Sequence, residues 1–306
     1  MIALAALSVS CADNAILEIE LDLPANTSGS PTYAFVQTRS ADTIDFSVGW
    51  GGSDAPDGFL HAEPTHPAAI AFVESGGDES ASLWWRSPIP PGRGLGFSGA
   101  ARVAGAVAAG RTQHEAFVAA ATLERHADNA AASAVGGLVA AARVRGGVHV
   151  VRLPLDVSLA FVVMVPDVTL STARARQALP AEVTRENAVF NLSRMALLLA
   201  GLADSRKLIP EAAEDRLHQD YRSPLFPAAP KMLAAMVAGG ALASCWSGAG
   251  PSLMAICAGI DAAQVVLATE AAMAECGLTG QVLHLHADHD GLIVDRDGSA
   301  GLYNDD

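Results

Sequence analysis

Two segments near the start of the chain alternate between apolar and polar residues. From residue 17 to 22, apolar residues alternate with carboxylates, and 43–48 repeats the alternation with isoleucine, phenylalanine and valine. A period of two is typical of a half-buried strand, so 15–22 and 43–48 are predicted strands. Stretches rich in turn residues at 26–31 and 49–58 predict loops.

Beyond residue 80 the pattern mixes the two kinds of element. Apolar or β-branched runs predict strands at 82–86, 148–153, 159–165, 242–246, 252–257, 281–286 and 291–294. Longer alanine-rich or amphipathic runs predict helices at 98–110, 113–125, 129–142, 172–179, 187–203, 211–218, 230–238 and 261–276. The regular alternation of a doubly wound sheet is missing, which favours an α+β fold. The turn at 143–147 predicts a boundary between domains at 1–146 and 147–306.

Composition narrows the class of protein. The 306 residues are 51% hydrophobic and 17% charged, which excludes intrinsic disorder and allows one large or two modest domains. A formal net charge of −14 would repel nucleic acid and an anionic membrane, so we expect neither as a partner. The acid lies in the flanks, whereas 86–287 holds 17 basic against 15 acidic residues. An anionic ligand could bind in this near-neutral centre.

The cysteines and the apolar runs indicate the cellular compartment of the protein. The chain has four cysteines: Cys11, Cys245, Cys257 and Cys276. They form no C-x-x-C pair and match no zinc spacing, so we expect reduced core thiols. The apolar segment 1–11 lacks the basic start and the cleavage site of a signal peptide, and the apolar run 232–260 is interrupted by glycines. We therefore expect a cytoplasmic protein.

The strongest local signal is a glycine-rich loop between a predicted strand and a predicted helix. It comprises Pro90, Pro91, Gly92, Arg93, Gly94, Leu95, Gly96, Phe97, Ser98, Gly99 and Ala100. Glycines allow tight turns and the first amides of a helix lack internal partners, so the segment can cradle a polyphosphate, with the Ser98 hydroxyl near phosphate or Mg²⁺. No lysine follows, which excludes a P-loop NTPase. The alternative is an ordinary glycine turn capped by Ser98.

A dense polar group follows the next predicted helix. It consists of Glu124, His126, Asp128 and Asn129. Carboxylate, imidazole and amide groups within one turn suit a metal and a polar substrate. The alternative is that Asp128 or Asn129 only caps the next helix.

Two arginines stand in polar surroundings, Arg176 and Arg222. Arginines usually lie on solvated surfaces. Because guanidinium groups bind carboxylates in bidentate fashion, however, the pair could hold an acidic or amino-acid substrate. The Ser-Gly-Ala-Gly-Pro turn at 247–251 is a weak signal by itself.

In combination these motifs are specific. In chain order they read P-x-x-x-G-L-G-x-S from Pro90, E-x-H-x-D-N from Glu124, S-T-x-x-A-R-x-x-L-P from Ser171, D-x-x-H-Q-x-x-R from Asp215 and S-G-A-G-P-S from Ser247. The set resembles the homoserine kinases of the GHMP small-molecule kinase family. This resemblance implies an N-terminal domain of the ribosomal S5 domain 2-like type, a ferredoxin-like C-terminal domain, ATP bound between them, and a homodimer.

The resemblance also implies roles for residues. The loop 90–100 would wrap the triphosphate of ATP, and Ser98 and Glu124 would hold Mg²⁺. The implied contacts to the amino-acid substrate are His126, Asp128, Asn129, Thr172, Arg176, Arg222, Gly248 and Gly250. The implied catalytic set is Ser98, Glu124, Asn129 and Arg176. The reaction would be transfer of the γ-phosphoryl group to the hydroxyl of L-homoserine, giving O-phospho-L-homoserine for threonine biosynthesis.

The sequence departs from the family pattern in three places. The family's opening N-L-G-x-G-F-D loop has no counterpart before Ile2, so we expect the chain to begin where that loop ends. Phe97 replaces a serine and is expected to add bulk to the phosphate loop, while Arg125 and Ala127 replace a glycine and a proline. Two alternatives therefore stay open: a paralogue acting on another hydroxy or amino acid, and a catalytically silent protein that binds a metabolite.

Overall fold

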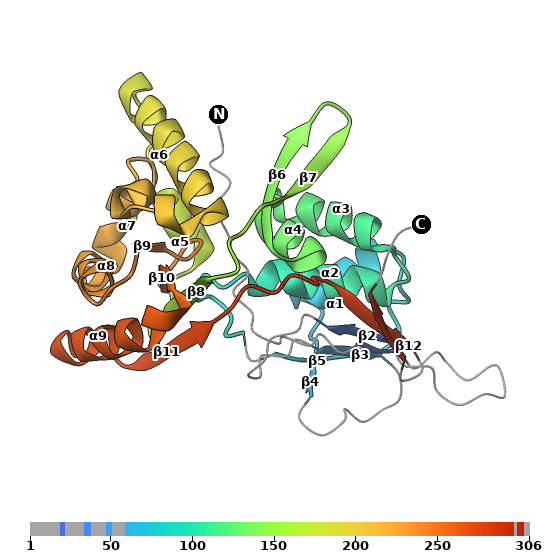
Figure 1. Cartoon of the computed structure of the whole chain (residues 1–306). Coiled ribbons are helices and arrows are strands. Elements are labelled where there is room, and N and C mark those ends of the chain that lie inside the picture. Colours follow the sequence, from blue (N-terminus) through green and yellow to red (C-terminus); the bar gives the residue numbers. More distant parts are fainter. Residues whose placement is uncertain are drawn as a thin grey trace. The chain divides into compact units, whose positions relative to one another are not determined.

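The computed structural model describes residues 19–21, 34–37, 47–50, 59–87, 89–296 and 299–302 (Figure 1). Contacts divide the chain into two compact units. The first unit comprises residues up to Pro90, Gly96–Leu153 and the segment from Ala287 onward, and the second comprises Pro91–Leu95 and Pro154–His286. The predicted boundary at 146/147 falls in the turn of a hairpin, whereas this division falls after Leu153, because both strands of the hairpin belong to the first unit.

The described residues of the first unit form two small sheets and a hairpin. Its strands are β1 (Ile19–Leu21), β2 (Ala34–Gln37), β3 (Ser47–Trp50), β4 (Leu60–His61), β5 (Leu83–Arg86), β6 (Leu138–Val144), β7 (Gly147–Leu153), β12 (Ile293–Arg296) and β13 (Ser299–Leu302). The strand orders are β1-β3-β5-β4 and β13-β12-β2, and β6 pairs with β7 alone.

Helix α2 forms the centre of the first unit. The helices here are α1 (Pro67–Glu74), α2 (Phe97–Ala108), α3 (Gln113–Glu124) and α4 (Asp128–Val135). Most residues of α2 are small and buried, so α1, α3 and α4 all pack closely against it. Helix α3 begins at a capping box, in which Thr112 and Glu115 each satisfy a backbone amide of the other. The ends of α2, α3 and α4 therefore have fixed positions around one alanine-rich core.

The second unit is built on one antiparallel sheet. Its strands are β8 (Leu159–Pro166), β9 (Ala243–Trp246), β10 (Leu253–Ala258) and β11 (Gly280–Leu285), in the order β11-β8-β10-β9. All eight residues of β8 are buried, as expected for a central apolar strand. In chain order the strands are arranged fourth, first, third and second, with helices after the first and third. This is the ferredoxin-like arrangement, and the predicted α+β class is confirmed.

The helices of the second unit differ in their contacts with this sheet. They are α5 (Thr172–Gln177), α6 (Arg185–Ala203), α7 (Gln219–Arg222), α8 (Ala229–Ala238) and α9 (Ala262–Glu275). Helix α8 packs on β9 and β10, and α9 on β8, β10 and β11. Apolar residues of α8, such as Met232 and Met236, are fully buried against the sheet. No helix in the described part of the chain is long and apolar enough to cross a membrane.

Two predicted helices are wrong in part. The helix predicted at 129–142 ends at Gly136, where φ is 72°, and Gly137 follows with φ 66°, so the chain turns and enters β6. The alanine-rich β6 has high helix propensity, but pairing with β7 overrides it. The helix predicted at 211–218 is instead a 3₁₀ turn at Pro210–Ala213 followed by a loop, because the Asp215 side chain takes backbone amides that a helix would use.

Most other predicted elements of the described chain are confirmed within one to three residues at each end. Helix α1 has no predicted counterpart, although His66 as N-cap and Pro67 at the first helical position are a recognised start signal. The loop predicted at 26–31 and most of the loop predicted at 49–58 lie outside the described residues, as do parts of the strands predicted at 15–22 and 43–48.

Candidate active site

The first half of the glycine-rich loop is held by the second unit. The Ser247 hydroxyl donates to the carbonyl of Gly94 at 2.9 Å, and the amide of Ser252 donates to the carbonyl of Arg93 at 3.2 Å. Gly94 has φ +78°, and a Cβ there would lie 2.3 Å from the carbonyl oxygen of Ser247. Two motifs far apart in the sequence, the loop and the Ser-Gly-Ala-Gly-Pro turn, therefore form one backbone contact that only glycine permits.

Arg93 also anchors this half of the loop. Its guanidinium donates to the carbonyls of Pro166 and, at 2.7 Å, Val168, at the end of β8. The amide of Leu170 is 3.4 Å from the carbonyl of Gly92. The Arg93 side chain is therefore used to position the loop backbone.

The second half of the loop belongs to the first unit and opens α2. Gly96 is the N-cap of α2 with φ 77°, a conformation that favours glycine. A Cβ on Gly99 would lie 2.8 Å from the Cβ of Asn129, so the first turn of α2 packs directly on the first turn of α4. The first amides of α2 have no partner within the helix and suit an anion. The loop glycines and Asn129, both predicted site features, are in contact.

Phe97 does not add bulk to the ligand side of this loop, and the expectation that it would is wrong. Its ring is 9% exposed and belongs to the core of the first unit. The ring lies edge-on to Trp85 at 5.5 Å and to His66 at 5.7 Å between centroids. Burial and the charge of Arg102 lower the pKa of His66 to about 4, as expected in an apolar setting. Phe97 therefore offers a phosphate only its backbone.

Ser98 and Glu124 are brought together by a third residue, Arg102. Arg102 Nη1 donates to Glu124 Oε1 at 2.8 Å and to the Ser98 hydroxyl. The Glu124 side chain is 3% exposed, and its Oε2 is buried without a hydrogen-bond partner. Sequence reasoning missed Arg102, whose only signal is its position one helical turn after Ser98.

Ser98 and Glu124 are the residues of this cluster that could hold a magnesium ion. Mg²⁺ prefers oxygen ligands and commonly takes one or two carboxylates plus phosphate oxygens and water. Ser98 and Glu124 supply a hydroxyl and a carboxylate, and the orphaned Glu124 Oε2 is an acceptor that needs a cation or a donor. Among the described residues no group of three or more histidine, cysteine or acidic side chains could hold a metal by itself. Phosphate oxygens of a nucleotide would complete the coordination.

The predicted polar turn after α3 forms a compact group. His126 Nδ1 lies 2.7 Å from Asp128 Oδ1 and 3.7 Å from Glu124 Oε2. Burial raises the pKa of Asp128, but the hydrogen bond and charge of His126 and the amide of Asn129 outweigh it, and the pKa lies below its usual value. Asp128 is therefore an ionised carboxylate that orients the His126 ring.

Arg125, at the end of α3, has φ 62°, the one positive φ of a non-glycine residue in the described chain. An L-residue is strained there, which gives a physical reason for glycine at this position of the family pattern. We expect Arg125→Gly to raise the free energy of unfolding by about 0.5–1 kcal/mol, measured by urea denaturation. Arg125→Ala keeps the Cβ and should give no such gain. A loss of stability in Arg125→Gly would contradict the strain argument.

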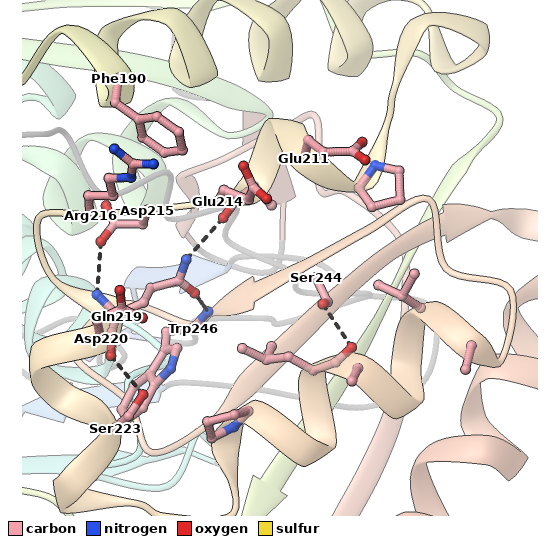
Figure 2. Close-up of a pocket in the computed structure, with 17 residues that line it drawn as sticks. Phe190, Glu211, Glu214, Asp215, Arg216, Gln219, Asp220, Ser223, Ser244 and Trp246 are labelled. Carbon is pink, nitrogen blue, oxygen red and sulfur yellow. Dashed lines mark hydrogen bonds between the residues drawn. The ribbon is translucent and has the colours of Figure 1, made fainter. Parts of the chain in front are cut away.

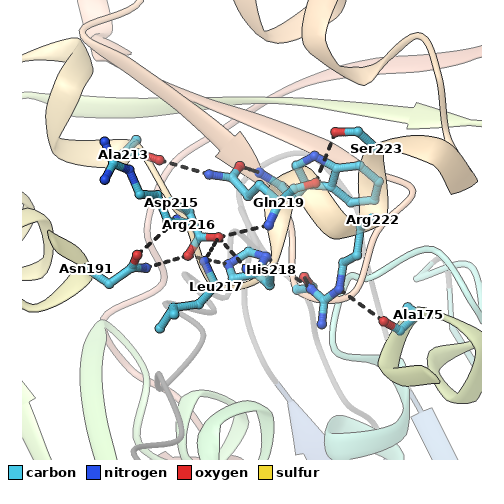
Figure 3. A network of polar contacts seen from close by, with 12 residues as sticks. Ala175, Asn191, Ala213, Asp215, Arg216, Leu217, His218, Gln219, Arg222 and Ser223 are labelled. Carbon is cyan, nitrogen blue, oxygen red and sulfur yellow. Dashed lines mark hydrogen bonds and ion pairs between the residues drawn. The ribbon is translucent and has the colours of Figure 1, made fainter. Parts of the chain in front are cut away.

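Arg222 lies at the centre of a polar network in the second unit (Figure 3). The residue is 9% exposed, its Nη1 donates to the carbonyl of Gly248 at 2.9 Å, and its Nε lies 3.4 Å from the carbonyl of Ala175. Burial lowers its pKa and the charge of Arg176 lowers it further, which together outweigh the opposite effect of Asp215, although an arginine remains protonated in proteins.

Asp215 fixes the loop that leads to Arg222. Its Oδ1 accepts the amides of Leu217, His218 and Gln219 at 2.5–2.9 Å, and Asn191 Nδ2 donates to its Oδ2 at 2.6 Å (Figure 3). Burial raises the pKa of Asp215, but the charge of His218 and these hydrogen bonds outweigh it, so the pKa is below its usual value. Asp215 is thus a structural anchor.

We expect Asp215→Asn to lower the free energy of unfolding by about 2–4 kcal/mol at pH 7, because one amide nitrogen would face that of Asn191. A depressed pKa stabilises the fold above the unfolded value of about 4, and that contribution disappears as the pH falls through the folded pKa. The stability difference from wild type should therefore shrink below about pH 4. The matched control is the exposed Asp220→Asn. A constant difference from pH 7 to pH 3, measured by urea denaturation, would contradict this account.

The other predicted site residues of the second unit lie on helix α5 and in the glycine turn at 247–251. Thr172 and Arg176 are exposed on the short helix α5, which is capped by Ser171. Gly248 and Gly250 have φ 53° and 78°, and a Cβ on Gly250 would lie 2.4 Å from the Trp246 ring. These glycines shape the turn that accepts the Arg222 hydrogen bond.

A cavity of about 840 Å³ opens beside this network in the second unit (Figure 2). Its wall includes Phe190, Asp215, Gln219, Leu233 and Trp246. The Gln219 side chain bridges the carbonyl of Ala213 and the amide of Trp246, so its polar ends are used within the fold. None of Arg176, Arg222 and Gly248 lines the cavity.

Comparison with known proteins agrees with this geometry. The family model described as GHMP kinases C terminal matches residues 196–274. The crystal structure of homoserine kinase from Cytophaga hutchinsonii has a TM-score of 0.67 and 23% identity, covering 88% of this chain and 90% of that chain. The fold and the family match together indicate a GHMP-type kinase.

Curated relatives narrow the family further. Homoserine kinase of Moorella thermoacetica is 42% identical over 219 residues, which cover 69% of this chain and 74% of that protein. Homoserine kinase of Microchaete diplosiphon is 37% identical over 217 residues, covering 69% and 71%. The chain therefore belongs to the homoserine kinase family.

Proposed function

We propose that this protein transfers the γ-phosphoryl group of ATP to the side-chain hydroxyl of L-homoserine. A bond forms between the hydroxyl oxygen and the γ-phosphorus, the bond from that phosphorus to the β–γ bridging oxygen breaks with its electron pair staying on ADP, and the hydroxyl proton passes to solvent. The products are O-phospho-L-homoserine and ADP. The observation that carries the proposal is the identity of 37–42% to two named homoserine kinases over about 70% of the chain.

The glycine-rich loop and the start of α2 would provide the nucleotide site. The loop 90–100 would wrap the triphosphate, with the amides at the start of α2 donating to phosphate oxygens. Ser98 and Glu124 would hold Mg²⁺, which supplies charge neutralisation for phosphoryl transfer when bound. The buried, orphaned Glu124 Oε2 supports this role.

The residues that the family resemblance implies for the amino acid would bind homoserine. We propose that Arg176 and Arg222 hold its carboxylate, which is supported by the buried position of Arg222 and the hydrogen bond that directs its guanidinium to the carbonyl of Gly248. His126, Asp128 and Asn129 would contact its polar groups, with Asp128 holding His126 in orientation. Thr172, Gly248 and Gly250 would shape the pocket. Such a site works by positioning and charge, without a strong base.

The proposal extends to the setting of the protein. We place the activity in threonine biosynthesis in the cytoplasm and expect a homodimer, as the family resemblance implies. Cys245, Cys257 and Cys276 are free thiols, which supports a reducing compartment.

A coupled assay of ADP release tests this function. With Mg·ATP we expect turnover with L-homoserine to exceed that with L-serine or with a hydroxy acid lacking the amino group, and EDTA to abolish it. Turnover with another hydroxy acid alone would favour the paralogue. Absence of both turnover and an ATP-induced thermal shift would favour the silent protein.

A further inference from the structure

Arg102 lies within the Ser98–Glu124 cluster although none of the sequence motifs contains it. It is the only charged residue of α2, a helix otherwise made of small, apolar and mostly buried residues plus Ser98. An unpaired charge in such a place is strongly unfavourable, and a buried ion pair usually stabilises less than apolar packing. A cation on this core helix is therefore expected to bind a group that offsets the cost of burying it.

The ion pair that Arg102 makes is incomplete on both sides. Arg102 Nε is buried without a hydrogen-bond acceptor among the described residues. Glu124 Oε2 is likewise buried without a donor, since His126 Nδ1 at 3.7 Å lies beyond hydrogen-bond distance. Buried polar groups are almost always paired in folded proteins, so a further partner is expected at this cluster.

The two orphaned atoms have opposite requirements. The Nε of Arg102 needs an acceptor oxygen, preferably anionic, whereas Glu124 Oε2 needs a cation or a donor. A phosphate with its magnesium ion supplies both, because its non-bridging oxygens accept from guanidinium groups and its metal binds carboxylate. A bridging water would also satisfy both atoms, so the experiment must distinguish a bound phosphate from a bound water.

We propose that Arg102 is a phosphate-binding residue of this site. Before the nucleotide binds, Arg102 holds the Ser98 hydroxyl and the Glu124 carboxylate in place. With the nucleotide bound, its guanidinium donates to a phosphate oxygen and adds positive charge where the transferred group carries negative charge. This inference rests on the proposed function and extends it to a residue outside the family motifs.

Nucleotide binding without turnover tests the proposal. Isothermal titration calorimetry of the full chain with Mg·ATP, with ATP plus EDTA, and with adenosine compares wild type, Arg102→Met and Arg102→Lys. We expect Arg102→Met to weaken binding of Mg·ATP and of ATP about 10- to 100-fold and to leave adenosine unchanged. Arg102→Lys should recover part of the loss. The matched control Arg143→Met removes an exposed arginine whose Nη2 donates to Ala121, and should bind as wild type.

The outcomes distinguish a failure of this inference from a failure of the proposed function. Unchanged ATP affinity in Arg102→Met, beside normal binding by wild type, overturns the inference and leaves the kinase function standing. An equal loss for adenosine also overturns it, since the role would then be structural. Failure of wild type to bind ATP overturns the proposed function instead. If Arg102→Met does not fold, the same test uses a background without the Glu124 charge. The double variant Arg102→Met/Glu124→Gln is then compared with the single variant Glu124→Gln.

Discussion

Replacing Glu124 by glutamine is expected to lower kcat at least about 100-fold. Glutamine keeps the volume of the side chain but removes the charge that would hold Mg²⁺ beside the phosphates. The side chain is 3% exposed, and its Oε2 has no hydrogen-bond partner and is available to a cation. The measurement is steady-state ADP release with saturating homoserine and ATP over a range of Mg²⁺ concentrations.

The control for this variant is Glu79→Gln, which neutralises an exposed glutamate of the same unit. It should retain wild-type kcat. Circular dichroism establishes that Glu124→Gln is folded, because the change also removes the charge partner of Arg102. A folded Glu124→Gln variant with wild-type kcat at every Mg²⁺ concentration would contradict the assignment of this carboxylate.

Replacing Arg222 by methionine should lower kcat/KM for homoserine about 30- to 1000-fold, mainly through KM. Arg222 is buried, and its contacts with the backbone of Gly248 and Ala175 fix the direction of the guanidinium. Methionine fills similar space without the charge or the donors that would bind the substrate carboxylate. The KM for ATP should stay within about twofold of wild type. Initial rates with each substrate varied in turn measure both constants.

Arg216→Met is the matched control for the arginine substitution. Arg216 is an exposed residue of the loop that leads to Arg222, and its guanidinium lies 3.9 Å from the centre of the Phe190 ring. We expect this variant to keep the KM for homoserine. If Arg222→Met raised the KM for ATP and left that for homoserine unchanged, the assignment of Arg222 to the amino acid would be wrong.

The sequence predicted helices and strands best where the hydrophobic pattern of a segment fitted one of the two and excluded the other. The apolar, β-branched run of β8 is too short for a core helix and is a strand. The segment of β6, rich in alanine, has no such signal, and its state depends on pairing with β7. The loop from Asp215 has helical composition, but its conformation is set by three backbone amides that one side chain accepts. The secondary structure of such segments depends on tertiary contacts, which cannot be read from the local sequence pattern.

Candidate site residues could be predicted where they are close together in the sequence. Glu124, His126 and Asp128 occupy one turn, so their proximity follows from spacing alone. Arg102 could not be found in this way, because a single arginine in an alanine-rich helix forms no motif. Its meaning becomes visible only when the end of α3 brings Glu124 against the first turns of α2.

The most direct test of the account is to identify the product. The protein is incubated with L-homoserine and Mg·ATP, and phosphorus-31 NMR follows the reaction with proton-coupled spectra of the product. The account predicts a phosphomonoester resonance coupled to a methylene group, growing in equal amount with ADP and absent without homoserine. Formation of ADP and inorganic phosphate without the ester, or no consumption of ATP at all, would contradict it.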